Sequence, residues 1–100
     1  MPEHELELPE DFAEYEYEYE AKGYLAGARI LRGGEHAQVV FYDPVRLAQD
    51  IEDELAAGNC PAYPNLVVVP EITKQSITRA VESLAESDFA ELVFRPTPTG

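Results

Sequence analysis

The segment from Glu14 to Glu20 reads EYEYEYE, and its strict alternation constrains the local fold more than any other part of the chain does. Successive side chains of a β-strand point to opposite faces, so a strand would place these Glu residues on one face and the Tyr residues on the other. Tyr is also enriched in strands. We therefore predict a β-strand at residues 12–21, which a tight link at Lys22 and Gly23 joins to the next strand.

The acidic charge is concentrated in the same region. The chain of 100 residues has a formal net charge of −13. Residues 1–20 contain nine Asp or Glu and no Lys or Arg, whereas the remainder has eleven acids and seven bases. A pI near 4.3 disfavours nucleic acid or an anionic membrane as the main partner, because phosphates would be repelled. The charge asymmetry indicates a basic protein surface as the partner, and the alternative is that the charge serves only solubility.

The composition predicts a single globular domain. An apolar share of 45% is ordinary for a folded protein. A chain of this length buries about two-thirds of its unfolded surface. We assign residues 12–95 to the domain, residues 1–11 to an acidic arm that is either flexible or a marginal first strand, and residues 96–100 to a frayed tail.

The sequence predicts a cytoplasmic location. Cys60 is the single cysteine, so no internal disulfide can form. No apolar run has the length that a bilayer requires, and the acidic start differs from the basic start of a signal peptide.

Glycines predict a β-hairpin after the Glu/Tyr segment. Gly33 and Gly34 both accept the positive φ that a two-residue type I′ turn requires, and strand-forming residues flank them. We predict strands at residues 24–32 and 36–42. Gly27 indicates a bulge or a close backbone approach within the first of these strands.

Two amphipathic helices are predicted after the hairpin. Asp43 caps the first, Pro44 suits its first position and Gly58 ends it, while Thr73 caps the second. In both segments apolar residues recur every three or four positions. These residues are Leu47, Ala48, Ile51 and Leu55 in the first helix and Ile77, Ala80, Val81, Leu84 and Ala85 in the second.

The order of elements predicts an α/β fold, a two-layer sandwich of the α+β-like kind. An N-terminal antiparallel β-ribbon and hairpin is followed by αβαβ, with a central strand at residues 66–69 and a last strand at residues 89–94. Right-handed crossovers place the two helices on one face of a mixed sheet and leave the second face uncovered. The predicted core consists of Ile51, Leu55, Val67, Val69, Ile77, Val81, Leu84 and Leu92.

No motif predicts a catalytic residue, a metal site or a cofactor. His4, His36 and Cys60 lack the spacing of metal ligands, and acidic neighbours of Cys60 disfavour a reactive thiolate. The acids at residues 50–54 fit the solvent side of a helix. Lys74, near the start of the second helix, gives only a hint of an anion site. The sequence therefore leans against an enzyme.

A partner-binding site is predicted in the Glu/Tyr segment. Tyr buries a large area at small entropic cost, and carboxylates accelerate association with a basic target. The alternative is an ordinary half-buried strand with Tyr against the core and Glu in water. The predicted partner-binding residues are Glu14, Tyr15, Glu16, Tyr17, Glu18, Tyr19 and Glu20.

These observations support three functional hypotheses. The first is a non-catalytic acidic protein-binding domain: an inhibitor, antitoxin-like or immunity-type neutraliser of a basic partner. The second is a small homodimeric regulatory or ligand-binding α/β module that pairs through the uncovered sheet face or edge. The third is an enzyme with a site near the loop from Cys60 to Tyr63, which the lack of a complete catalytic set disfavours.

Overall fold

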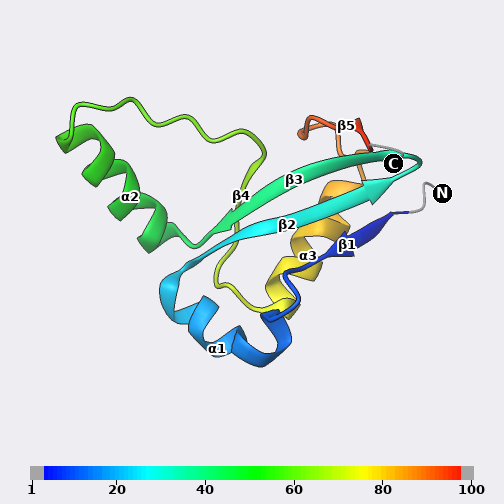
Figure 1. Cartoon of the computed structure of the whole chain (residues 1–100), viewed down its shortest axis with the longest axis horizontal. Coiled ribbons are helices and arrows are strands. Elements are labelled where there is room, and N and C mark those ends of the chain that lie inside the picture. Colours follow the sequence, from blue (N-terminus) through cyan, green and yellow to red (C-terminus); the bar gives the residue numbers. More distant parts are fainter. Residues whose placement is uncertain (1–3, 98–100) are drawn as a thin grey trace.

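A mixed sheet and three helices make up the fold of the predicted class (Figure 1). The computed structural model describes residues 4–97. In chain order, the elements are β1 (Glu5–Glu7), α1 (Phe12–Lys22), β2 (Tyr24–Arg32), β3 (Glu35–Tyr42), α2 (Pro44–Ala56), β4 (Leu66–Val68), α3 (Lys74–Ala85) and β5 (Arg95–Pro96).

The sheet has the order β1-β2-β3-β4, with β5 also paired to β3. β2 runs antiparallel to both β1 and β3, and β5 runs antiparallel to β3, whereas β4 runs parallel to β3. Because β2 occupies one edge of β3, both β4 and β5 lie along its other edge. β4 pairs there with residues 40–42 and β5 with residues 35–36. The prediction of a central strand at residues 66–69 is wrong, because β4 is an edge strand that pairs only with β3 among the described strands.

The predicted glycine turn is confirmed. Gly33 and Gly34 connect β2 to β3 with φ angles of 50° and 82°. The predicted irregularity at Gly27 is also confirmed, since the register of β2 against β3 shifts between Leu25 and Ala28. Gly27 has a φ of 89°, which a residue with a side chain rarely adopts.

The core lies on one face of the sheet. In Figure 1, α3 lies behind β2 and β3, while α1 lies at the lower end of the sheet. The sheet contributes six buried side chains: Leu25, Ala28, Ile30, Ala37, Val39 and Phe41. The facing layer contributes Phe12 from α1, Ile77 and Val81 from α3, and Val69, Ile72 and Phe89 from connecting segments.

The prediction of a strand at residues 12–21 is wrong, because this segment forms α1. Phe12 is buried and its ring lies 5.4 Å from that of Tyr19, on the other side of a kink at Tyr15 where the backbone departs from helical geometry. Gly23 ends the helix with a φ of 78°, and its N–H donates to the carbonyl of Tyr19. Contacts that form in the folded chain thus outweigh the strand preference of alternating Tyr.

The first predicted helix forms, but it does not enter the core. α2 has no buried residue, and it extends away from the end of the sheet in Figure 1. Ile51 and Leu55 therefore do not belong to the core, contrary to prediction. Of the other predicted core residues, three are buried and three are half-buried against the core: Val69, Ile77 and Val81, then Val67, Leu84 and Leu92. The helices that supply core residues are α1 and α3.

The prediction of a strand at residues 89–94 is also wrong. Two consecutive turns replace it, in which the N–H groups of Ala90 and Leu92 donate to carbonyls three residues earlier. Asp88 and Phe89 have φ angles of 54° and 57°, which are incompatible with an extended strand. The turns bury Phe89 against the core, so its apolar character reflects packing rather than sheet pairing.

The chain ends differ in part from the predicted arm and tail. Of the two alternatives for the acidic arm, residues 5–7 adopt the strand and pair with β2. Arg95 and Pro96 pair with β3, so the tail begins with a short strand. The remaining predictions for residues 1–3 and 98–100 lie outside the described residues. Within residues 4–97, no helix is both long enough and apolar enough to cross a membrane.

A pair of matched substitutions tests this assignment of the core. Val81→Asp buries an unpaired charge, so we expect it to unfold the domain or to lower the free energy of unfolding by more than about 3 kcal/mol. Leu55→Asp, on the surface of α2, should change this free energy by less than about 0.5 kcal/mol. Urea denaturation measures both, and equal losses would show that α2 packs into the core.

Candidate functional site

α2 is attached to the rest of the domain through its polar side. The Asp43 carboxylate caps the helix by accepting from the Arg46 N–H at 2.7 Å. The Asp50 carboxylate accepts from the Tyr42 hydroxyl at 2.7 Å and from Arg46 Nε at 2.9 Å. Tyr42 belongs to β3, so one carboxylate joins the helix to the sheet.

Aromatic and cationic contacts reinforce this attachment. The Arg46 guanidinium lies 5.1 Å from the centre of the Tyr24 ring, and Tyr24 stacks on Tyr42 with ring centres 5.6 Å apart. Arg46 Nη1 also donates to the carbonyl of Lys22 at 3.4 Å. The side of α2 that carries Arg46 and Asp50 therefore faces β2, β3 and the end of α1.

The junction between α1 and α2 requires a glycine. The Asp43 N–H donates to the Gly23 carbonyl at 2.8 Å. A Cβ atom at Gly23 would lie 2.7 Å from both the Asp43 carboxylate and the Arg46 Cβ atom. Only glycine fits this close approach together with the positive φ.

The apolar stripe of α2 is incompletely covered by the rest of the domain. In a helix of about 3.6 residues per turn, Leu47, Ile51 and Leu55 lie on a different side from Arg46 and Asp50. Leu47 and Ile51 are only half-buried, and Leu55 is 57% exposed. None of the three packs against the core. An amphipathic helix normally buries this stripe, so α2 presents the face that usually requires a partner.

Exposed carboxylates accompany the stripe. In the helical projection, Glu52 and Glu54 flank the stripe, and Asp53 lies on the polar side with Arg46 and Asp50. Within the described part of the chain, these three acids form no salt bridge. Glu54 accepts only a hydrogen bond from the Asn59 amide at 3.0 Å. Their charge is therefore available to a partner.

An aromatic and acidic hollow of about 440 Å³ lies between α2 and the loop at residues 57–65. The Tyr63 ring lies 5.7 Å from that of Tyr42, centre to centre. Aromatic faces next to carboxylates suit the cationic end of a Lys or Arg side chain. The residues that line the hollow are Tyr42, Asp50, Asp53, Glu54, Pro61 and Tyr63.

Tyr42 remains protonated at a pH at which an ordinary tyrosine ionises, because its pKa is raised. Burial raises the pKa of its hydroxyl, and the hydrogen bond to the Asp50 carboxylate raises the pKa further. The phenol is only 6% exposed. The neutral phenol can therefore act as a stable donor that holds Asp50 in place.

The seven predicted partner-binding residues do not form one surface, because α1 distributes them around a helix. Tyr17 is 80% exposed and Tyr15 is 44% exposed. Glu14 and Glu18 are also exposed and form no salt bridge with a described residue. Tyr19 is half-buried, and its hydroxyl donates to Asp11 at 2.8 Å. The hypothesis that this segment binds a partner stays a prediction.

Glu16 has a structural contact that the sequence did not indicate. Its carboxylate accepts from the Lys74 N–H at 2.9 Å, at the start of α3. Helix N-termini favour a negative charge. The anion suggested by Lys74 is thus a side chain of the protein itself, 58 residues away in the sequence.

The other residues considered for chemistry are His4, His36 and Cys60. Cys60 is exposed in the loop after the helix. Among the described residues, no three His, Cys, Asp or Glu side chains gather closely enough to hold a metal ion. Comparison with known proteins identifies no relative: no family model, curated protein or solved structure matches the chain.

Sequence reasoning missed α2 as a candidate site. Its apolar stripe was visible, but periodicity alone cannot tell whether the stripe packs inward or remains exposed. The Tyr63 ring was also missed, because the loop that carries it has no motif. The pairing of Asp50 with Tyr42 spans eight residues and depends on how the helix leaves the strand.

The contact between Glu16 and α3 predicts unequal effects of two glutamates. Glu16→Ala leaves the Lys74 N–H without its acceptor, so we expect the free energy of unfolding to fall by about 1 kcal/mol. Glu18→Ala removes the same charge from the same helix without removing a contact, and it should produce no measurable loss. Thermal unfolding of both variants measures the difference, and equal stabilities would rule out the cap.

The raised pKa of Tyr42 predicts alkaline instability. The neutral phenol is favoured in the folded state, so its stabilising contribution is complete below about pH 10 and is lost above that pH. Ultraviolet titration of the native protein should show a late-ionising component that Tyr42→Phe removes. Tyr17→Phe should keep this component. A Tyr42→Phe protein with an unchanged titration curve would contradict the assignment.

Proposed function

We propose that this chain is a non-catalytic domain that binds a basic protein partner, with α2 as its docking helix. The observation that carries the proposal is the orientation of α2. The Asp50 carboxylate and Arg46 turn the polar side toward the domain, which leaves Leu55 exposed and Leu47 and Ile51 only half-buried. Exposed apolar faces of this kind are typical of protein interaction sites.

The mode of binding that fits α2 is a helix in a groove. In this mode, apolar residues at helical spacing enter a hydrophobic groove on the other protein. Leu47, Ile51 and Leu55 have the required spacing. Glu52 and Glu54 flank them, so a groove with Lys or Arg on its rim would match both the apolar and the charged features.

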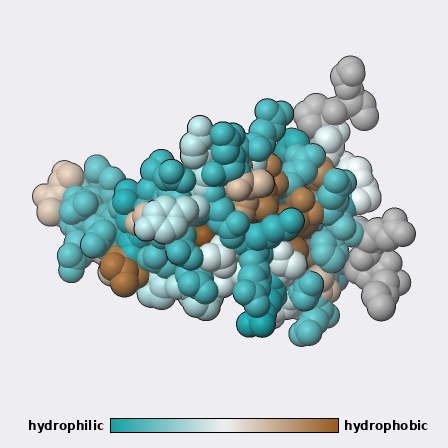
Figure 2. Space-filling view, turned by 90° about the horizontal axis from the view of Figure 1, so that it is seen from below, coloured by the Kyte–Doolittle hydropathy of each residue, from teal (hydrophilic) through white to brown (hydrophobic). Residues whose placement is uncertain are grey.

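The acidic N-terminal region supports a role in the encounter. Nine acids within residues 1–20 create a negative field that attracts a basic protein over a distance of about one Debye length, ~8 Å at physiological salt. Figure 2 shows the side on which α1 lies in Figure 1, and this side is mostly hydrophilic. We assign steering to this acidic N-terminal region and apolar docking to α2.

The alternative of a homodimer has one observation in its favour. Val68 of β4 is 50% exposed, and its pairing with Tyr42 places it on the sheet face opposite the core. However, each copy carries a formal charge of −13, so two copies repel each other. A basic partner gains from the same charge, and we therefore favour it.

Two substitutions distinguish the partners. Leu55→Asp should abolish binding to a purified partner that has been identified by cross-linking in the native host, while Val68→Asp should bind normally. The wild-type protein should have the mass of a monomer, 11.2 kDa, in light scattering. A dimeric mass that Val68→Asp converts to a monomer would instead establish the homodimer.

Charge substitutions test the match between the acids and a basic partner. Converting Glu52, Asp53 and Glu54 to their amides should slow association about tenfold at low salt and weaken its salt dependence. The control converts three exposed acids elsewhere, Glu71, Glu82 and Glu86, which also form no salt bridge with a described residue. Equal slowing by the two triple variants would attribute the effect to net charge and not to α2.

A further inference from the structure

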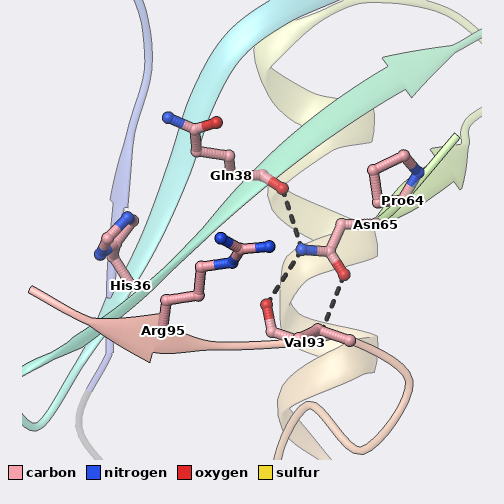
Figure 3. Close-up of a pocket in the computed structure, with 6 residues that line it drawn as sticks. All are labelled: His36, Gln38, Pro64, Asn65, Val93 and Arg95. Carbon is pink, nitrogen blue, oxygen red and sulfur yellow. Dashed lines mark hydrogen bonds between the residues drawn. The ribbon is translucent and has the colours of Figure 1, made fainter.

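A second hollow arises from the way two strands share one edge of β3. β4 pairs with residues 40–42 and β5 with residues 35–36, which leaves the edge at residues 37–39 without a strand. Asn65 bridges this gap. Its Nδ2 atom donates to the carbonyls of Gln38 at 3.1 Å and Val93 at 3.0 Å, and its Oδ1 atom accepts from the Val93 N–H at 2.8 Å (Figure 3).

The backbone of Asn65 is held as firmly as its side chain. Its carbonyl accepts from the Val40 N–H at 3.2 Å, next to the parallel pairing of β4. Asn65 has a φ of 54°, in the left-handed region that Asn tolerates better than most residues. Both N–H groups of its side-chain amide are used by these contacts, so Asn65 shapes the hollow and leaves the donors for an anion to its neighbours.

The hollow has a volume of about 520 Å³, within the range of small-molecule sites, about 300–1,000 Å³. His36 and Arg95 are direct partners in the pairing of β3 with β5, so their side chains lie on the same sheet face. The Arg95 side chain extends across the hollow toward Asn65 and Gln38 (Figure 3). The lining residues are His36, Gln38, Pro64, Asn65, Val93 and Arg95.

The charge of this hollow differs from that of the whole protein. No lining residue is acidic, although the chain has a formal net charge of −13. Of the four other arginines, Arg29, Arg32 and Arg46 each pair with a carboxylate, and Arg79 has no ion pair with a described residue. Arg95 has no such partner among residues 4–97. Glu35, the neighbour of His36, forms its ion pair with Arg32.

We infer that this hollow binds a small organic anion. Arg95 offers a planar pair of N–H donors that matches an oxyanion, either a carboxylate or a phosphate. The imidazole of His36 and the side-chain amide of Gln38 supply further donors. Val93, which is 65% exposed, and Pro64 also line the hollow and provide an apolar surface for a short hydrocarbon group. The ligand therefore combines one oxyanion with a small apolar body.

Nuclear magnetic resonance titration of the ¹⁵N-labelled full chain tests the site. The probes are acetate, butyrate and inorganic phosphate, with sodium chloride adjusted to keep the ionic strength constant. We expect saturable shifts at His36, Gln38 and the Arg95 side chain, with butyrate binding at least threefold more tightly than acetate because of its apolar chain. Tighter binding of phosphate than of both carboxylates would identify a phosphate compound as the ligand class.

Matched arginine variants complete the test. Arg95→Gln should weaken binding at least tenfold, and Arg95→Lys, which keeps the charge but not the fork, should weaken it less. Arg79→Gln removes an exposed arginine of α3 that also lacks an ion pair with a described residue, and it should bind as the wild type does. Unchanged binding by a folded Arg95→Gln protein overturns the inference. Shifts that never saturate also overturn it, as do shifts of the Arg79 side chain as large as those of the Arg95 side chain.

Discussion

The carboxylate of Asp50 determines which side of α2 the domain shows to its surroundings. It accepts hydrogen bonds from Tyr42 of β3 and from Arg46 of its own helix, and Arg46 in turn lies over Tyr24. These contacts satisfy the polar side of α2 against the sheet. The apolar stripe lies on another side of the helix, where Leu55 is exposed and Leu47 and Ile51 are half-buried. The proposed docking function depends on this orientation of α2.

The acidic residues of α1 have two separate roles in this structure. Glu16 contributes to stability, since it supplies a negative charge to the N-terminus of α3. Glu14 and Glu18 remain exposed and contribute to the field around the molecule. A uniform row of carboxylates would have served only the second purpose. In the helical conformation, some glutamates of this repetitive segment therefore stabilise the fold, and others contribute to the electrostatic field.

The proposed docking helix and the proposed anion site lie in different parts of the domain. α2 extends from the end of β3, while the hollow at Arg95 lies where β4 and β5 leave part of the β3 edge without a strand. Their charges are also opposite. Glu52 and Asp53 suit a basic protein, whereas Arg95 suits an anion. The two proposals therefore rest on independent observations, and each can fail without the other.

The sequence alone determined those elements that short-range chemistry specifies. The glycine pair sets the hairpin turn, Asp43 and Thr73 cap α2 and α3, and the apolar run of β4 joins the sheet, so the fold class could be predicted. α1 could not be predicted, because the alternation of Tyr and Glu favours a strand, while the contacts of Phe12 and Glu16 that favour a helix are made by the folded chain. Periodicity predicted the stripe of α2 but not its direction. Only the tertiary structure decided this direction, through hydrogen bonds between a helix and a strand whose relative placement no local pattern specifies.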